Sequence, residues 1–296
     1  MQTFQNYLSQ IPKFPIVSLD NFLSINQLSG KLYACLAYGG STGTIKSPLA
    51  YGMIALALEK RLLSPKQPIL EASSGTFGAA LTIAAQQLGH SIILCVPSTT
   101  PLERIQYLQQ IGATIKLLEA NTQTQIQEQS KLIAQTQDAY FIDCFNNDLN
   151  PEFHRRVTGP TILKATQGDL DFIVAGVGSG GTITGVGEYA KAWSNISMVA
   201  VEPYESQVLQ GGFWGKHTIK GIGLPFIPEN YNPYVVNRII SVTSGEAHFV
   251  AQQLALTEGI PACSSAGATV QAACHLLKEK PNCKVLCILS GIQLYK

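Results

Sequence analysis

Short apolar runs alternate with longer stretches of helical periodicity along most of the chain. The β-branched and apolar runs predict strands at residues 32–38, 68–72, 91–96, 114–118, 140–144, 171–175, 198–201, 239–242 and 284–289. Helical spacing of apolar residues predicts helices at residues 48–63, 77–88, 101–111, 123–136 and 245–258. Strands that are apolar throughout and are each followed by a helix are typical of parallel sheets covered on both faces. The pattern therefore predicts an α/β fold.

Two segments interrupt this alternation. The polar loop 146–151 (NNDLNP) separates two series of strands and helices, so we expect two lobes, each a mostly parallel sheet flanked by helices. Their expected bounds are 1–148 and 149–296, with about the first 36 residues free to cross to the second lobe. Segment 204–237 is rich in glycine, proline and aromatic residues, and we expect a long surface excursion that flanks a site.

Composition and charge narrow the function classes. The 296 residues include 20 Lys and Arg against 19 Asp and Glu, so no basic excess indicates a nucleic-acid partner. Every apolar run is interrupted before about 18 residues, so no membrane span is expected. The start MQTFQNYLSQIPKF has no secretory pattern. Seven cysteines without CxxC spacing predict reduced thiols in a cytoplasmic protein, and neither disulfides nor a metal site.

The candidate chemistry lies in three loops that each run from a predicted strand into a predicted helix, where open α/β sheets bind ligands. The first loop, GGSTGTIKSP at residues 39–48, holds Lys46, the only cation between Leu32 and Leu58. Its glycines allow the backbone to approach a ligand closely. The alternative is that Lys46 is one of the many lysines that lie in solvent.

The second loop, EASSGTFG, spans Glu71–Gly78. Hydroxyl groups and free backbone N–H groups at the start of a helix form a seat for a carboxylate or a phosphate. The alternative is an ordinary Ser or Thr N-cap.

The third loop, GVGSGGTITG at residues 176–185, has five glycines in ten residues at a helix entrance. Side-chain-free backbone of this kind can wrap a phosphate. The loop also satisfies GxGxxG, and Glu202 follows about 20 residues after it, which imitates a dinucleotide fingerprint. A nicotinamide-dependent oxidoreductase is therefore an alternative, although it leaves the first two loops unexplained.

Together these loops resemble the motifs of the fold-type-II enzymes that use pyridoxal 5′-phosphate (PLP), in the cysteine synthase (O-acetylserine sulfhydrylase) and cystathionine β-synthase family. GTIKS resembles the family's Schiff-base lysine motif, SSGTFG its substrate-carboxylate loop and GVGSGGTITG its phosphate loop. Further similar segments in family order are PSTTPLERIQYLQQIGA, NPEFHRRVTGP, VAVEP, KGIGLPFIP, CSSAGA and ILSGIQLY. The resemblance covers roughly residues 12–295 and implies the two-lobed fold of the tryptophan synthase β chain.

The resemblance also implies roles for single residues. Lys46 is implied as the catalytic residue that forms the Schiff base with PLP and moves the Cα proton. The implied cofactor-binding residues are Lys46, Thr76, Gly178, Ser179, Gly180, Gly181, Thr182 and, at the pyridine nitrogen, Ser290. The implied substrate-binding residues are Ser73, Ser74, Gly75, Phe77, Cys144 and Gly221.

The implied activity is β-replacement or β-elimination on an activated L-serine derivative through an α-aminoacrylate intermediate. Such an enzyme is a transferase or lyase of amino-acid biosynthesis, and the family resemblance implies a homodimer. Ordinary cysteine synthesis and a relative with another donor or nucleophile both stay open. A PLP-fold protein that has lost turnover and serves as a binding or regulatory partner is a further alternative.

The sequence departs from the family pattern in the expected substrate pocket. Thr76 replaces an asparagine that contacts the cofactor's 3′-oxygen, Phe77 replaces a small hydroxylated residue, and Cys144 replaces a glutamine. Loss of both amides removes donors from a site built for a polar substrate. Ordinary packing is the alternative for Phe77, and a small buried hydrophobe is the alternative for Cys144. We expect His154, which has no partner at metal spacing, to be a solvated helix residue.

Overall fold

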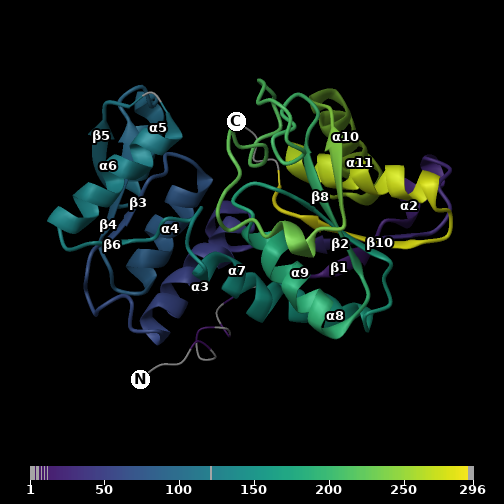
Figure 1. Cartoon of the computed structure of the whole chain (residues 1–296), viewed down its shortest axis with the longest axis horizontal. Helices are drawn as coiled ribbons and strands as arrows, with labels where there is room; N and C mark the ends of the chain where they lie inside the picture. Colours follow the sequence, from purple (N-terminus) through teal and green to yellow (C-terminus); the bar gives the residue numbers. More distant parts are fainter. Residues whose placement is uncertain are drawn as a thin grey trace. The chain divides into compact units, whose positions relative to one another are not determined.

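The computed structural model describes residues 4, 7, 9, 11, 13–120 and 122–292 (Figure 1). These residues form two compact units. The first unit holds the described residues within 1–12, 39–42 and 46–149, and the second holds those within 13–38, 43–45 and 150–292. The chain therefore passes from one unit to the other several times before Lys46.

A four-stranded, fully parallel sheet forms the centre of the first unit. Its strand order is β5 (Thr114–Leu118), β4 (Ile92–Pro97), β3 (Ile69–Glu71) and β6 (Tyr140–Phe141). The helices of the unit are α3 (Lys46–Glu59), α4 (Thr76–Gln87), α5 (Leu102–Gln110) and α6 (Gln123–Thr136), with the 3₁₀ turn η1 (Gly40–Thr42) before them. Parallel strands end at the same edge of a sheet, so the loops after β3 and β6 are neighbours.

A six-stranded sheet forms the centre of the second unit. Its strand order is β1 (Ile16–Ser18), β2 (Lys31–Leu36), β10 (Lys284–Leu289), β7 (Phe172–Gly176), β8 (Ser197–Pro203) and β9 (Arg238–Val242). Only the β1–β2 pair is antiparallel. Strand β10 lies between β2 and β7, so a strand made late in the chain completes the middle of the sheet.

Helices cover both faces of this sheet: Figure 1 shows α10 (Ser244–Glu258) and α11 (Ser264–Glu279) on one face and α8 (Gly159–Thr166) and α9 (Gly181–Trp193) on the other. The shorter elements are α2 (Asp20–Ile25), α7 (Leu149–Phe153), the π-helical turn η2 (His154–Thr158) and the 3₁₀ turn η3 (Pro233–Val235). Helix α10 begins with a full capping box from Thr243 and Glu246, which accounts for its well-defined start.

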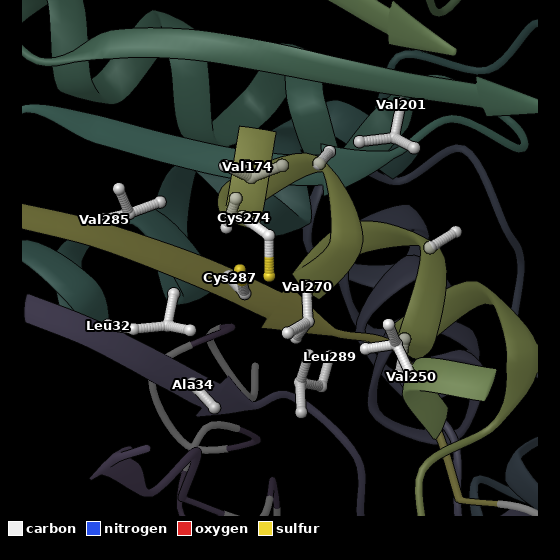
Figure 2. Close-up of a cluster of buried hydrophobic side chains, with 14 of the residues drawn as sticks. Leu32, Ala34, Val174, Val201, Val250, Val270, Cys274, Val285, Cys287 and Leu289 are labelled. Carbon is white, nitrogen blue, oxygen red and sulfur yellow. The ribbon is translucent and has the colours of Figure 1, made fainter. Parts of the chain in front are cut away.

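The core under α10 and α11 is made largely of aliphatic side chains together with cysteines (Figure 2). Val174, Val285 and Cys287 from the strands pack with Val270 and Cys274 from α11, and all five are at most 5% exposed. All seven cysteines of the chain are free thiols. In the part of the chain that the structure describes, no helix has both the length and the apolar character needed to cross a membrane.

The predicted α/β class with two mostly parallel sheets is confirmed. Each of the nine predicted strands overlaps an observed one, while the three-residue β1 and the helices α2, α7, α8, α9 and α11 had no predicted range. Helix α11 is buried continuously from Ser264 to Val270, so its partly exposed and exposed polar residues are confined to the remainder of the helix. Segment 204–237 is not a surface excursion throughout, because Ile219, Ile222 and Tyr231 are buried. The ends of the resemblance, at residues 12 and 293–295, lie outside the described residues.

Candidate functional site

Lys46 is the first residue of α3 in the first unit and is half-buried. The turn before it is held within the same unit, because Ser47 Oγ accepts the N–H of Thr42 at 3.0 Å and lies 2.7 Å from Thr42 Oγ1. Helix α3 is buried from Ser47 to Ala57. Lys46 is therefore a cation at the start of an otherwise apolar, packed helix, and its backbone is fixed by that packing.

The loop Ser73–Gly75 leads from β3 into α4. The Ser73 hydroxyl oxygen accepts the N–H of Gly78 at 3.1 Å and that of Gly75 at 3.3 Å, so Ser73 caps the first turn of the helix. The N–H groups of Thr76 and Phe77 also point out of this turn, since a helix supplies no carbonyl partner for its first residues. The N-cap and anion-seat interpretations are thus compatible, because one hydroxyl caps the helix while other donors stay available.

Arg104 on α5, which was not among the predicted site residues, forms a hydrogen bond to this loop. Its Nε–H donates to the Ser74 carbonyl oxygen at 2.6 Å. The segment PSTTPLER contributed to the family resemblance, but its spacing gave no signal that Arg104 contacts the loop. The guanidinium adds positive charge beside a loop predicted to bind a carboxylate.

Glu71, at the end of β3, is fully buried and joins two predicted substrate-binding segments. Its Oε1 accepts the N–H of Ala72 at 2.9 Å and its Oε2 accepts the N–H of Cys144 at 3.2 Å. Burial raises the pKa of this carboxyl to about 8, Asp143 adds to the rise, and the two N–H donors oppose it. Glu71 is therefore largely protonated near neutral pH.

Cys144 follows β6, and its side chain is 6% exposed. Burial raises the pKa of its thiol well above the ordinary value, Glu71 and Asp143 add to the rise, and Lys46 lowers it. A buried thiol of raised pKa is a poor nucleophile, so the interpretation of Cys144 as a small apolar group is favoured. Within the first unit, the fold brings Lys46, Cys144 and the end of β3 into electrostatic reach of one another.

The glycine-rich loop of the second unit links β7 to α9, a helix of 13 residues. Gly180 is the N-cap residue with φ +81°, a left-handed conformation that only glycine adopts freely. A Cβ on Gly180 would lie 2.8 Å from Tyr231 Cα, and one on Gly178 would collide with the carbonyl oxygen of Gly221. The structure thus places Gly178 and Gly221, two predicted site residues, against each other.

Two buried side chains support the hydroxyl groups of this loop. Asn150 Nδ2 donates to Ser179 Oγ at 3.0 Å, and His154 Nε2 lies 3.1 Å from Thr182 Oγ1. The other ring nitrogen of His154 lies 2.9 Å from Thr158 Oγ1. Both Ser179 and Thr182 are therefore held from the side of α7 and η2.

The expectation that His154 is solvated was wrong, because its side chain is 0% exposed. The π-helical turn η2 places His154 against α9, where a Cβ on Gly185 would lie 2.7 Å from His154 Cβ. Burial lowers the pKa of His154 to about 3, so the ring is neutral. A π-helical turn in this segment is the structural feature that the sequence pattern did not reveal.

Glu202, the acidic residue of the apparent dinucleotide fingerprint, is 1% exposed. Its carboxylate accepts the N–H of Leu209 at 2.7 Å and the side-chain amide of Gln210 at 3.0 Å. These bonds use the carboxylate inside the protein, whereas a dinucleotide site needs it for a ribose.

Ser290 follows β10 in the second unit. Its backbone oxygen accepts the N–H of Ile45 at 2.8 Å, and its Oγ lies 3.0 Å from Ser265 Oγ. Thr44 forms an antiparallel bridge with Gly291. The second unit therefore holds the residues immediately before Lys46 by backbone pairing.

The residues of the glycine-rich loop fit a phosphate monoester. The loop combines a left-handed glycine at the head of a long helix, backbone too crowded for side chains, and two hydroxyl groups held from behind. A helix N-terminus and oriented N–H groups favour an anion. In the described part of the chain, no group of three or more His, Cys, Asp or Glu residues could hold a metal ion.

Comparison with known proteins gives the family context. The chain matches the family model described as "Pyridoxal-phosphate dependent enzyme" over residues 8–291. Cysteine synthase A of Escherichia coli strain K12 is 34% identical over 264 residues, which cover 85% of this chain and 82% of that protein. Cysteine synthase B of Campylobacter jejuni is 32% identical over 293 residues, 98% of this chain and 96% of that protein.

Solved structures are similar over nearly the whole chain. Cysteine synthase from Entamoeba histolytica has a TM-score of 0.89 at 27% identity, covering 98% of this chain and 88% of that one. O-ureido-L-serine synthase has a TM-score of 0.86 at 28% identity, covering 99% and 92%. A hydrogen sulfide-producing enzyme, solved with an α-aminoacrylate intermediate, has a TM-score of 0.84 at 28% identity, covering 97% and 88%.

Proposed function

The chain belongs to the pyridoxal-phosphate dependent enzymes of fold type II, in the cysteine synthase family, and we propose that it catalyses β-replacement or β-elimination on an activated L-serine derivative. The observation that carries this proposal is the glycine-rich loop before α9, which combines a left-handed glycine at the helix N-terminus with hydroxyl groups fixed by Asn150 and His154. Lys46 supplies the amine that such a cofactor needs.

The predicted cofactor-binding and catalytic residues have the following tasks in this proposal. The loop Gly178–Thr182 binds the phosphate, Ser290 donates to the ring nitrogen, and Thr76 lies at the ring's 3′-oxygen. With the cofactor present, Lys46 would hold its aldehyde group and, when free, would carry the substrate Cα proton. PLP, when bound, supplies the electron sink that makes this proton removable.

The substrate side is assigned to the first unit and Gly221. Ser73, Ser74 and Gly75 bind the substrate carboxylate, and this assignment is supported by the N–H groups of the first turn of α4 and by Arg104 behind Ser74. Phe77 and Cys144 of the first unit are assigned to the side of the leaving group and the incoming nucleophile, and Gly221 of the second unit stays a predicted substrate-binding residue. A serine at the ring nitrogen, in place of a carboxylate, leaves that nitrogen largely unprotonated and suits rapid loss of a β-leaving group.

The nucleophile and the leaving group stay open. The relatives include enzymes named for cysteine synthesis, O-ureido-L-serine synthesis and hydrogen sulfide production. The departures at Thr76, Phe77 and Cys144 favour a donor or nucleophile other than those of ordinary cysteine synthesis. Assembly as a homodimer and a cytoplasmic location stay predictions.

A second candidate is a protein that binds PLP without turnover. The observation that favours it is the apolar character of the pocket residues, since Phe77 and Cys144 are at most 7% exposed and offer no amide to a substrate. Protein that binds PLP but shows no spectral response to any amino acid would support this candidate.

The first experiment tests the cofactor and its lysine. Purified protein reconstituted with PLP is expected to be yellow, and borohydride is expected to bleach the visible band. Lys46→Ala is expected to lose the covalent band and at least a thousandfold in activity, because the amine is required for both. Lys131→Ala, which removes an exposed lysine of the same unit, is the matched control and keeps both. A colourless protein that takes up no PLP would contradict the proposal.

The second experiment identifies the donor. Stopped-flow absorbance with L-serine, O-acetylserine and O-phosphoserine is expected to show a transient with at least one activated serine and none with L-serine. An unchanged spectrum with O-acetylserine alone would favour a specialised donor. No response to any of the three would favour the protein without turnover.

A further inference from the structure

Three side chains of the second unit form a hydrogen-bonded row that ends at Ser290. Cys263 Sγ lies 3.2 Å from Ser265 Oγ, and Ser265 Oγ lies 3.0 Å from Ser290 Oγ. Cys263 is the N-cap residue of α11, and its N–H donates to the Gly291 oxygen at 3.2 Å. Ser265 is 4% exposed, whereas Cys263 is partly exposed. The first turn of α11 is thus attached to the end of β10 by both backbone and side chains.

A hydroxyl group carries one proton, so the direction of each bond in this row determines the next. If Ser290 donates its proton to a ring nitrogen, its oxygen is free to accept from Ser265. Ser265 then has no proton left for the sulfur, so its oxygen accepts from the Cys263 thiol. The row therefore runs from Cys263 through Ser265 to Ser290, with each group donating towards the next.

We infer that Ser265 and Cys263 are positioning residues that orient the Ser290 hydroxyl so that its proton faces the cofactor nitrogen. This inference rests on the proposed function, because Ser290 needs a ring nitrogen to face. Chains of hydrogen bonds in a buried setting polarise one another, so a donor to Ser290 strengthens the bond that Ser290 gives. Removing the Cys263 proton, or capping the sulfur, turns the Ser265 proton towards the sulfur and leaves Ser290 without its donor.

The experiment measures the ring nitrogen itself. The holoenzyme is reconstituted with PLP labelled with ¹⁵N in the ring, and its ¹⁵N chemical shift and visible absorption maximum are recorded. In Ser265→Ala the nitrogen signal is expected to move towards that of a pyridine without a donor, and kcat is expected to fall about fivefold, as for loss of one neutral hydrogen bond. The KM for the amino-acid donor is expected to change less than twofold, because Ser265 is not assigned to substrate.

Cys263 offers a matched pair of variants. Cys263→Ser keeps a donor and is expected to retain the wild-type nitrogen signal, whereas Cys263→Ala removes the donor and is expected to shift it in the same direction as Ser265→Ala, by less. Cys263 is partly exposed, so these variants test the row even if Ser265→Ala does not fold. Cys274→Ala, a buried cysteine of the same helix outside the row, controls for general loosening of α11.

The outcomes separate the two proposals. PLP uptake with an unchanged nitrogen signal in both Ser265→Ala and Cys263→Ala overturns the inference and leaves the proposed function intact. An equal shift in Cys274→Ala also overturns it, because the effect would then come from packing. Failure of the wild-type chain to take up PLP overturns both, since Ser290 then faces no nitrogen.

Discussion

The two candidate anion-binding loops, one in each unit, differ in where their backbone is crowded. In the glycine-rich loop before α9, a Cβ on Gly178 would collide with Gly221, and Gly180 adopts a left-handed conformation. In the loop before α4, the nearest atom to a Cβ on Gly75 is Ser73 Oγ at 3.9 Å, and the crowded glycine is instead Gly78 in the first helical turn, where a Cβ would lie 2.4 Å from the Ser73 carbonyl oxygen. The first loop matches its family motif almost residue for residue, and the second departs at Thr76 and Phe77.

The side chains that support the two loops also differ in chemical character. Neutral hydrogen-bonding side chains, Asn150 and His154, support the glycine-rich loop. A buried carboxyl, Glu71, and a cation, Arg104, support the loop before α4. A crowded loop tolerates few side chains, whereas a roomy one accepts substitution without refolding. Change of specificity is therefore expected in the first unit, while the phosphate seat in the second stays constant.

The largest expected effect is a loss of PLP affinity when the crowded glycine-rich loop is disrupted. Gly178→Ala places a methyl group against the Gly221 carbonyl, and overpacking of this kind costs about 1–3 kcal/mol. PLP affinity is expected to fall about a hundredfold, measured by fluorescence titration of the apoprotein. Gly75→Ala is the matched variant in the roomy loop and is expected to leave PLP affinity within about threefold. Equal losses in the two variants would show that the loops do not differ in tolerance.

The second prediction is that the local stability of the two units depends on pH with opposite sign, beginning with Glu71 in the first unit. The Glu71 carboxyl has a folded-state pKa raised to about 8, so the folded state holds a proton that the unfolded chain releases near 4.5. Its contribution is therefore complete below pH 4.5 and is lost as pH rises towards 8, about 2 kcal/mol between pH 6 and 8. The hydrogen-exchange protection factors of β3 and β6, which correct for the intrinsic pH dependence of exchange, are expected to fall over this range.

The opposite sign is expected at His154. Its folded-state pKa is lowered to about 3, so its contribution is complete above pH 6.5 and is lost as pH falls towards 3. The protection factors of η2 and the start of α9 are thus expected to fall in acid, not in alkali. Glu71→Gln, which cannot ionise, is the control and is expected to flatten the alkaline response alone. An alkaline response that persists in Glu71→Gln would contradict the assignment.

The smallest expected effect is a change in activity caused by a substitution in the loop before α4. Thr76→Asn restores the amide of the family motif at a partly exposed position, so little strain is expected. The kcat/KM for O-acetylserine is expected to rise about tenfold, the equivalent of one well-placed hydrogen bond. Thr76→Val, which matches the shape of threonine without its hydroxyl, is the control and is expected to give no gain. A fall with Thr76→Asn would show that the pocket is adapted to another donor.

The sequence was most informative where a single local pattern determines the structure. Apolar runs located all nine predicted strands, and glycine spacing located the loop before α9 because crowded backbone admits no other residue. It was least informative where the structure depends on pairing of distant segments. Arg104, 30 residues after Ser74, contacts the loop through its side chain, and no periodicity marks such a contact.

The burial of His154 was likewise not predictable from the local sequence pattern. The absence of a partner at metal spacing suggested a solvated helix residue, yet His154 lies buried in the π-helical turn. Glu71 was part of a recognised loop, but its burial and its bond to Cys144 depend on the pairing of β3 with β6. Whether a side chain at the end of a parallel strand is buried depends on the neighbouring strands of the sheet. These strands are distant in sequence, so the residues around Glu71 do not predict its burial.

Strand β10 has a consequence for the synthesis of this protein. It pairs with β2, which precedes it by about 250 residues, and with β7 on its other side. At translation rates of about 5–20 residues per second, β2 waits more than ten seconds for this partner. Until then the nascent chain exposes two apolar strand edges, which invite aggregation. Completion of the second unit must follow synthesis of β10, so this protein is expected to depend on chaperones during translation more than a protein built from consecutive hairpins.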